Sequence, residues 1–350
     1  MSAIVNKVLK SSNILLIPRG IRSRCLASSW NKNSIVQCNV DGSKSLRIGV
    51  LGASFEMGQP KSGVAKSPDI LIKEMNMIKQ LEDMGHNVDF KGILKHDPVQ
   101  EIEGKGMALN RENVHAYNLK LKNEVSNILK DNRFCLVIGG DHSIGIGTVS
   151  GFTNVHPNGC LLWVDAHSDI NTPDTSDSGN MHGMPVAYQI SELYDSFKDK
   201  CSVCDWHEPR LSPDRIAFIG LRSVDPGEVK TLKDLNIEAY YMNDIDELGI
   251  NEVIRRSLRK INPNNDRPLH VSFDIDSLDP SEAPTTGTPV RGGLTLREGF
   301  RILYECHKSG CLTALDMVEV NTYLGNEKES IKTLTSAEQL ILSAFGQLVR

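Results

Sequence analysis

The chain has 350 residues, of which 39% are hydrophobic and 24% charged, and its formal net charge is −5. These proportions are those of a globular protein, and no stretch approaches the roughly 20 apolar residues that a membrane-spanning helix needs. The first 40 residues contain six basic residues and no acidic one, so without them the net charge would fall from −5 to −11. A chain this acidic is a poor partner for phosphate backbones, and we expect no nucleic-acid and no membrane partner.

The N-terminal segment, residues 1–45, is predicted to be a mitochondrial transit peptide outside the folded domain. It is rich in basic residues, serine and asparagine, and its apolar patch, Ile14–Ile17, lies between basic residues. Such a composition is typical of import sequences. It also fits a disordered tail whose first 40 residues lack acidic residues by chance. The predicted location is therefore the mitochondrial matrix, with the cytoplasm as the alternative.

From residue 46 onward, short apolar strands alternate with amphipathic helices. A first strand is expected over 46–52, followed by a helix over 68–84, which starts at Pro68 and stops at Gly85, and a helix over 114–129. The remaining expected elements are 134–138, 144–155, 160–164, 184–196, 215–220, 227–235, 250–261, 269–274, 295–308, 312–318 and 335–346.

Strands that are apolar on both faces indicate a parallel sheet covered by helices, which is an α/β fold. No repeat or low-complexity linker interrupts residues 46–350, so a single domain is predicted over that range. In open parallel sheets, ligands bind outside the carboxyl ends of the strands. Several Asp and His residues of this chain fall at those ends.

Three short polar motifs each follow a run that is predicted to be a buried strand. They are Gly139–Ser143 (GGDHS), Asp165–Asp169 (DAHSD) and Asp274–Pro280 (DIDSLDP). Burying carboxylates beside such strands costs several kcal/mol unless a cation compensates them. The motifs therefore predict a metal site. Oxygen ligands with a minority of imidazole suit Mn²⁺ better than a structural Zn²⁺, which would prefer thiolates.

The number of ligands points to two ions. Alternate residues of an extended chain share a face, so the His and Asp side chains of each motif are expected to converge. Two imidazoles and four carboxylates exceed the needs of one ion and fit two divalent ions about 3.5–4 Å apart. Taken singly, each motif also fits a helix N-cap or an Asx turn, and only the three together favour the metal site.

The eight cysteines do not indicate a disulfide scaffold in a chain of this length. Cys135 and Cys160 lie in apolar strand-like runs and are expected to be small buried side chains. Cys201 and Cys204, followed by His207, have ligand-like spacing, but no second pair completes a tetrahedral site. An exposed loop is favoured there over a zinc or redox site.

In this order, the three motifs resemble those of the ureohydrolases, the dimanganese enzymes that include arginase and agmatinase. The resemblance covers nearly all of residues 46–350, and Ser272–Pro280 is its most specific part. It implies a three-layer α/β/α fold of the arginase/deacetylase type, with a parallel sheet of about eight strands. It also implies a homotrimer and two Mn²⁺ per subunit. By motif position, the implied metal ligands are His142, Asp165, His167, Asp169, Asp274 and Asp276.

Residues after the second motif resemble the arginase branch rather than the agmatinase branch. In that branch Asn171, Ser178 and Asn180 would hold the substrate α-carboxylate, which agmatine lacks, and Asp225 would lie near the α-amino group. Ser178 is followed by glycine and also fits an ordinary turn. The resemblance thus implies hydrolysis of L-arginine to L-ornithine and urea.

The resemblance assigns further roles near the reacting group. Thr288 and Glu319 match substrate-binding positions, and Glu319 would orient the guanidinium; Glu319 also fits a structural ion pair. Asp169 would pass a proton to the leaving amine, and His182 would shuttle protons between the site and solvent. The chain departs from the expected pattern at peripheral positions: Lys61, Ser62, Ser223 and Thr322.

Two alternatives remain open from the sequence. The first is an agmatinase or another guanidino-acid hydrolase. The second is a non-catalytic arginine-binding regulatory protein that kept the scaffold, although the full ligand set together with His182 and Glu319 argues against loss of catalysis.

Overall fold

The computed structural model describes residues 36–38, 44–101, 108–200 and 205–347. These residues form one nine-stranded sheet in the order β1-β2-β4-β9-β8-β5-β6-β7, with β3 paired to β2. The strands are β1 (Val36–Cys38), β2 (Lys44–Ser54), β3 (Asn87–Lys95), β4 (Phe134–Ile138), β5 (Cys160–Val164), β6 (Ile216–Leu221), β7 (Glu238–Tyr241), β8 (Leu269–Asp274) and β9 (Leu312–Val318). All pairings are parallel except that of β1 with β2. The eight strands β2–β9 therefore form the expected parallel sheet.

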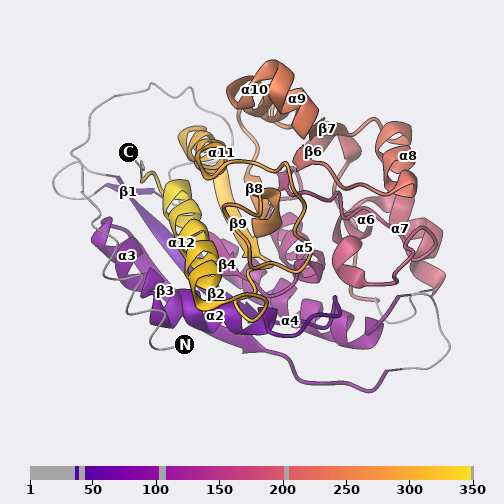
Figure 1. The fold of residues 1–350 in the computed structure, drawn as a ribbon, viewed down its shortest axis with the longest axis horizontal. Coiled ribbons are helices and arrows are strands. Elements are labelled where there is room, and N and C mark those ends of the chain that lie inside the picture. The colour runs from indigo at the N-terminus through magenta and orange to yellow at the C-terminus, as the bar shows by residue number, and fades with distance from the viewer. Residues whose placement is uncertain (1–35, 39–43, 102–107, 201–204, 348–350) are drawn as a thin grey trace.

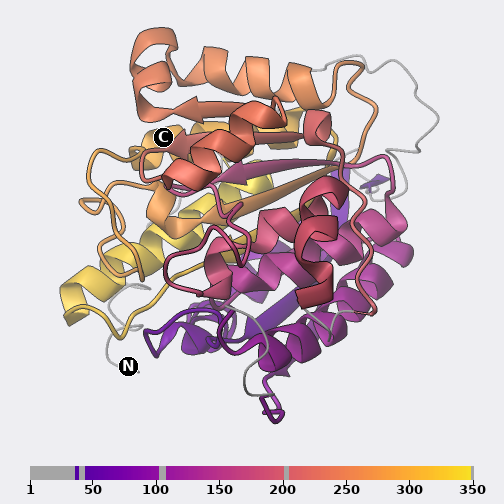
Figure 2. The same ribbon diagram turned by 90° about the vertical axis from the view of Figure 1, so that its right-hand side faces the viewer.

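Helices cover both faces of this sheet, as Figures 1 and 2 show. One apolar core lies between the sheet and α2 (Ser67–Asp69), the π-helical turn Ile70–Glu74, α3 (Met77–Asp83), α9 (Met242–Leu248), α10 (Ile250–Ile261), α11 (Leu296–Lys308) and α12 (Glu327–Ala344). The other lies under α4 (Arg111–Lys130), α5 (Gly145–Val155), α6 (Pro185–Gln189), α7 (Ser191–Phe197) and α8 (Pro226–Asp234). The three-layer α/β/α architecture is confirmed. It arises because the central strands are apolar on both faces and must be covered on both.

The central elements have the predicted bounds. Strands β4, β5, β8 and β9 and helix α10 begin and end where their apolar runs do, and β4 and β5 are buried along their whole length. Cys135 and Cys160 are buried in these strands, as expected. Burial on both faces leaves a strand little freedom in composition, which is why the bounds of these strands are readable in sequence.

Two predicted helices are each broken in the structure. The segment 68–84 is interrupted before Met77 by Asn76, which has a left-handed backbone with φ of 54°. The segment 184–196 divides at Ile190, whose extended backbone separates α6 from α7. Single continuous helices were wrong there because the apolar spacing continues across a residue whose backbone is not helical.

Other elements were missed or too short in the prediction. The edge strands β3 and β7 and helix α9 were not expected, and α12 starts at Glu327 rather than at 335. Strand β3 has a mixed, partly exposed burial pattern, so it lacks the apolar run of a central strand.

At the N-terminus, five residues of the predicted 1–45 segment belong to the sheet, the three of β1 and the first two of β2, while 1–35 and 39–43 lie outside the described residues. Cys201 and Cys204 also lie outside them. No helix within the described ranges is long and apolar enough to cross a membrane.

Candidate metal centre and active site

Five neighbouring strands bring the polar motifs to one edge of the sheet. Their order is β4, β9, β8, β5 and β6, and each is followed within a few residues by a predicted site residue. In that order the residues are His142, Glu319, the pair Asp274 and Asp276, the set Asp165, His167 and Asp169, and Asp225. The site lies outside the carboxyl ends of parallel strands because all five strands point the same way.

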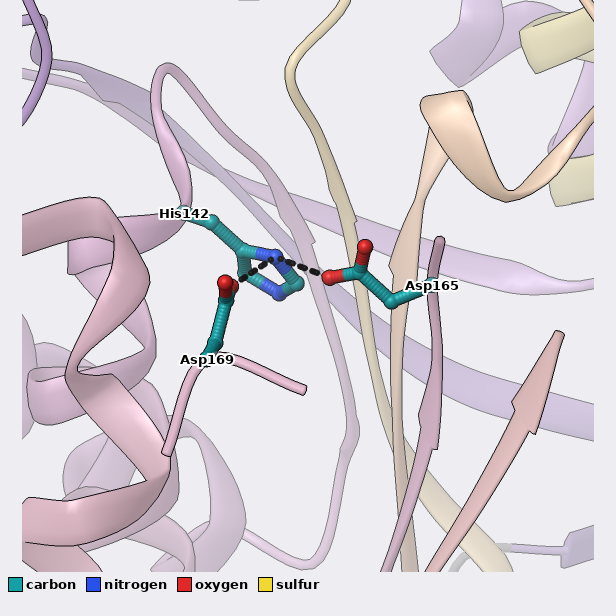
Figure 3. A group of neighbouring side chains, drawn as sticks. All are labelled: His142, Asp165 and Asp169. Carbon is teal, nitrogen blue, oxygen red and sulfur yellow. Dashed lines mark ion pairs between the residues drawn. The ribbon is translucent and has the colours of Figure 1, made fainter. Parts of the chain in front are cut away.

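The first group of candidate metal-binding residues, called here a cation group, lies around His142, which stands in a short 3-10 turn after β4. Its Nδ1 lies 3.1 Å from a carboxylate oxygen of each of Asp165, Asp169 and Asp274. Figure 3 shows the imidazole of His142 between Asp165, which comes from the end of β5, and Asp169, which comes from the following loop. His142, Asp165 and Asp169 have ligand atoms within 4.8 Å of one another, close enough to hold one cation.

A second group, formed by Asp165, His167 and Asp276, adjoins the first and shares Asp165 with it. His167 Nδ1 lies 3.4 Å from Asp165 Oδ1 and 3.2 Å from Asp276 Oδ2. Asp165 therefore turns one oxygen toward each imidazole. This arrangement is what a carboxylate bridging two cations requires.

The residues of both groups fit bound cations. All four carboxylates are buried, and His142 Nδ1 is a buried nitrogen without a hydrogen-bond partner among the described residues, although three carboxylate oxygens surround it. Such a cluster is costly unless positive charge compensates it. Because ligand imidazoles must be neutral, a metal ion would take the place of their protons.

The raised pKa values of His142 and His167 also indicate that both groups favour bound positive charge. Burial alone would lower the pKa of His167, but Asp276 and Asp165 outweigh it and raise that pKa to about 12. For His142, burial is likewise outweighed by Asp165, Asp169 and Asp274, and its pKa is raised. The carboxylates thus favour positive charge at both imidazoles.

Two of the ligands reach the site by turns rather than by the expected strand alternation. Strand β5 ends at Val164, and Asp169 has a left-handed backbone with φ of 48°. Asp276 lies in a 3-10 turn after β8, where its N–H donates to Asp274 Oδ1 at 2.8 Å. The alternation argument was wrong for these two residues because the extended chain stops before them, and it does not account for His167 either, which lies three residues beyond the end of β5. A non-glycine residue with positive φ is uncommon and is often found at functional sites.

Buried side chains hold the ligands in place from behind. His142 Nε2 lies 2.9 Å from Ser272 Oγ, and Ser272 in turn donates to Asp316 Oδ2 at 3.2 Å. Trp163 stacks on the His142 ring at 4.0 Å and donates from Nε1 to Asp165 Oδ2 at 3.0 Å. With the Nε2 proton donated to Ser272 Oγ, Nδ1 of His142 is left free for a metal.

Glu319 and His182 lie beside the first group. Glu319 follows β9 with φ of 61°, accepts the His142 backbone N–H at 2.9 Å, and lies 3.3 Å from His182 Nδ1. Burial lowers the pKa of His182, but the Glu319 carboxylate outweighs it and raises that pKa to about 9. Burial, and then the charge of Asp165, raises the pKa of Asp169 to about 7.

The predicted substrate residues form separate local contacts. Asn171 Nδ2 donates to Asp225 Oδ2 at 3.0 Å, and Thr288 Oγ1 donates to Asp276 Oδ2 at 2.9 Å. Ser178 is exposed, and its Oγ accepts the backbone N–H of Asn180 at 3.2 Å. The structure therefore joins Asn171 with Asp225 and Thr288 with the second group, and records no contact between the Ser178 turn and Asn171.

Several supporting residues were missed at the sequence level. Ser272 and Trp163 stand two residues before Asp274 and Asp165 in extended strands, so strand alternation could have placed them on the ligand face. Asp316 is the acidic residue inside the apolar strand β9, which was an available signal.

The chain matches the Arginase family over residues 46–346. It is 44% identical over 301 residues to the hepatic arginase of Aquarana catesbeiana, covering 86% of this chain and 93% of that protein. It is 43% identical over 302 residues to the mitochondrial arginase-2 of Homo sapiens, covering 86% and 85%. Among solved structures, the arginase of Bacillus caldovelox superposes with a TM-score of 0.78 at 32% identity, covering 87% of this chain and 99% of that one.

Proposed function

Because the chain belongs to the Arginase family, we propose that it is an enzyme that hydrolyses the guanidinium group of L-arginine to give L-ornithine and urea. The observation that carries this proposal is the pair of adjoining cation groups that share Asp165 and have Glu319 beside them. The relatives named above are arginases, and their similarity extends over the whole site region.

The two groups are proposed to hold two Mn²⁺, with Asp165 between them. Their four carboxylates match the charge of two divalent ions, and imidazole with carboxylate oxygen suits manganese. When bound, two such ions lower the pKa of a shared water, so that hydroxide is available near neutral pH.

Glu319 is proposed to bind the substrate guanidinium. It is a buried carboxylate at the edge of the cation groups, and a carboxylate can accept two parallel N–H bonds from a guanidinium. Its fixed position, set by the His142 N–H, would hold the guanidinium carbon in one orientation.

Asp169 and His182 are proposed to move protons. The buried carboxylate of Asp169 would accept a proton from the attacking solvent molecule and pass it to the leaving amine. His182 is part-buried, in contact with Glu319, and is placed to exchange protons with solvent.

Polar residues that follow β5 and β6 are proposed to bind the α-carboxylate and α-amino groups of L-arginine. Asn171, Ser178 and Asn180 would bind the α-carboxylate, Asp225 would bind the α-amino group, and Thr288 would support the second cation group. These polar residues distinguish L-arginine from agmatine, which has no α-carboxylate.

Location and assembly are proposed on sequence grounds. The first 40 residues, which contain no acidic residue, and the likeness to a mitochondrial arginase-2 support import into the mitochondrial matrix. The family resemblance supports a homotrimer, which light scattering of the purified protein would test. A fusion of residues 1–45 to a fluorescent protein that stays in the cytosol would contradict the proposed import.

The proposed activity is tested by urea release from a panel of guanidines, with Mn²⁺ added and withdrawn. We expect turnover of L-arginine with Mn²⁺ and loss of turnover after chelation. Faster urea release from agmatine than from L-arginine would reassign the substrate. Two Mn²⁺ bound per chain without urea from any guanidine would indicate a binding protein instead.

A further inference from the structure

Arg222 stands one residue beyond β6, outside the sets of residues assigned above to metal or substrate. Its backbone N–H donates to Ala166 O at 2.9 Å, and the N–H of Ser223 donates to the same oxygen at 3.0 Å. Ala166 lies between Asp165 and His167, so the main chain at Arg222 is bound directly to the segment that carries two members of the second cation group.

The side chain of Arg222 reaches a different segment. Its guanidinium donates to the main-chain oxygens of Asp276 at 2.6 Å, Ser277 at 3.1 Å and Leu278 at 3.1 Å. It also donates to Val290 O at 2.8 and 3.1 Å and to Gly220 O at 3.2 Å. Among the described residues, it makes no ion pair with a carboxylate. All the hydrogen bonds that the structure shows from this side chain go to main-chain carbonyls.

The geometry of these contacts requires a guanidinium. Its planar fork offers five donors in fixed directions, whereas a lysine ammonium is a single point with three donors. The chain also approaches the fork closely at Gly293, where a Cβ would lie 2.6 Å from Arg222 Nη2. A side chain at that position would displace the fork.

The segments joined by Arg222 carry the Asp165–His167–Asp276 group and, next to it, Thr288. Ala166 adjoins Asp165 and His167, and the turn that holds Asp276 is bound by the fork. Val290 lies two residues after Thr288, whose hydroxyl donates to Asp276 Oδ2. We propose that Arg222 is a positioning residue that assembles the Asp165–His167–Asp276 group and sets Thr288 against it. This proposal rests on the proposed two-metal function.

The first group has a different support. His142 is held by Ser272 and Trp163, and Arg222 contacts neither of them nor His142. Asp165 belongs to both groups, so loss of the fork is expected to weaken the ion of the Asp165–His167–Asp276 group strongly and the ion beside His142 much less.

The test compares Arg222→Lys with Arg215→Lys. Arg215 lies just before β6, at the opposite end of the same strand, and its guanidinium also donates to main-chain carbonyls, those of Pro157, Gly159 and Arg210. Arg215→Lys therefore removes a guanidinium that binds main-chain carbonyls away from the site, and it is the matched control. Mn²⁺ affinity and stoichiometry are measured by equilibrium dialysis with metal analysis, and folding by circular dichroism.

We expect Arg222→Lys to bind one Mn²⁺ about ten- to a hundredfold more weakly than the wild type, with the other within about twofold. We expect Arg215→Lys to bind both as the wild type does. Equal weakening of both ions in Arg222→Lys would overturn the proposal. A second outcome would also overturn it: Arg222→Lys binds both ions with unchanged affinity, but its melting temperature after chelation is well below that of Arg215→Lys. Arg222 would then serve stability alone.

A second variant, Arg222→Gln, keeps the test decisive if the lysine variant unfolds. A folded Arg222→Gln that binds both ions normally would overturn the proposal, whereas selective loss of one ion would support it. The wild type separates this question from the proposed function. A wild-type protein that binds fewer than two Mn²⁺ contradicts the two-metal function itself, whatever the variants do.

Discussion

At the scale of single residues, the groups that are proposed to move protons lie next to the groups that are proposed to bind substrate. His182 and Glu319 are 3.3 Å apart, and Asp169 belongs to the first cation group. Their titration differs because their surroundings differ. Burial raises the pKa of Asp169 to about 7, whereas the Glu319 carboxylate, acting against burial, raises the pKa of His182 to about 9.

Replacing His182 by Asn is expected to lower kcat for L-arginine about a hundredfold, because a positioned acid–base group typically contributes that much or more. Metal content is expected to stay at the wild-type value, since His182 is not in either cation group. The measurement is the pH–rate profile of urea release, with added imidazole as a rescue. Full turnover of His182→Asn across pH 7–10 would refute the shuttle role.

Replacing Asn171 and Ser178 by Ala is expected to raise KM for L-arginine about tenfold, because hydrogen bonds to a charged group would be lost. KM for guanidines that lack an α-carboxylate is expected to change little. Steady-state kinetics with both kinds of substrate provide the measurement and its internal control. Equal changes for both substrates would contradict the assignment of these residues to the α-carboxylate.

At the scale of elements, the turns after the strands decide the geometry of the site. Gly140, between β4 and His142, has no room for a side chain, since a Cβ there would lie 1.7 Å from Phe55 O. Its own carbonyl accepts the N–H of Glu319 at 2.9 Å. The ends of β2, β4 and β9 are thus in backbone contact at the point where the first cation group begins.

Gly140→Ala is therefore expected to destabilise the protein by about 1–3 kcal/mol and to weaken Mn²⁺ binding, because the clash is with main chain that cannot rotate away. Gly183→Ala is the control, since a Cβ at Gly183 meets nothing within 4 Å although it follows His182. Urea denaturation and metal titration of both variants give the comparison. A Gly140→Ala protein as stable as Gly183→Ala would show that the turn has more room than the structure indicates.

At the scale of the whole molecule, metal binding and folding are expected to be coupled. The cation groups join the ends of strands that are far apart in sequence, so each bound Mn²⁺ should stabilise the folded chain by about 2.7 kcal/mol at a hundred times its Kd. The rise in melting temperature on adding Mn²⁺, and its loss on chelation, measure this.

The same coupling predicts a pH dependence of metal uptake. In the protein stripped of metal, neighbouring carboxylates raise the pKa of His142 and raise that of His167 to about 12, so both imidazoles hold protons at neutral pH. Because Mn²⁺ must displace those protons, its affinity should increase from pH 6 to pH 8, with protons released on binding. Calorimetry in buffers of different ionisation enthalpy counts them. Equal affinity at both pH values would contradict this linkage.

Sequence alone determined the parts of this protein that depend on local pattern. The runs that form β4, β5, β8 and β9 are apolar on both faces, and burial restricts them so strongly that their bounds are readable. The motifs after them identify the ligand types, because several carboxylates buried together at strand ends need a cation to offset their desolvation.

Only the tertiary structure decided how those parts meet. The order β4-β9-β8-β5-β6 sets which motifs are neighbours, and left-handed turns at Asp169 and Glu319 aim their side chains. The fork of Arg222 and the contact of Asp316 with Ser272 join segments distant in sequence. Such contacts are chosen by packing of the whole chain, and no local pattern of residues specifies them.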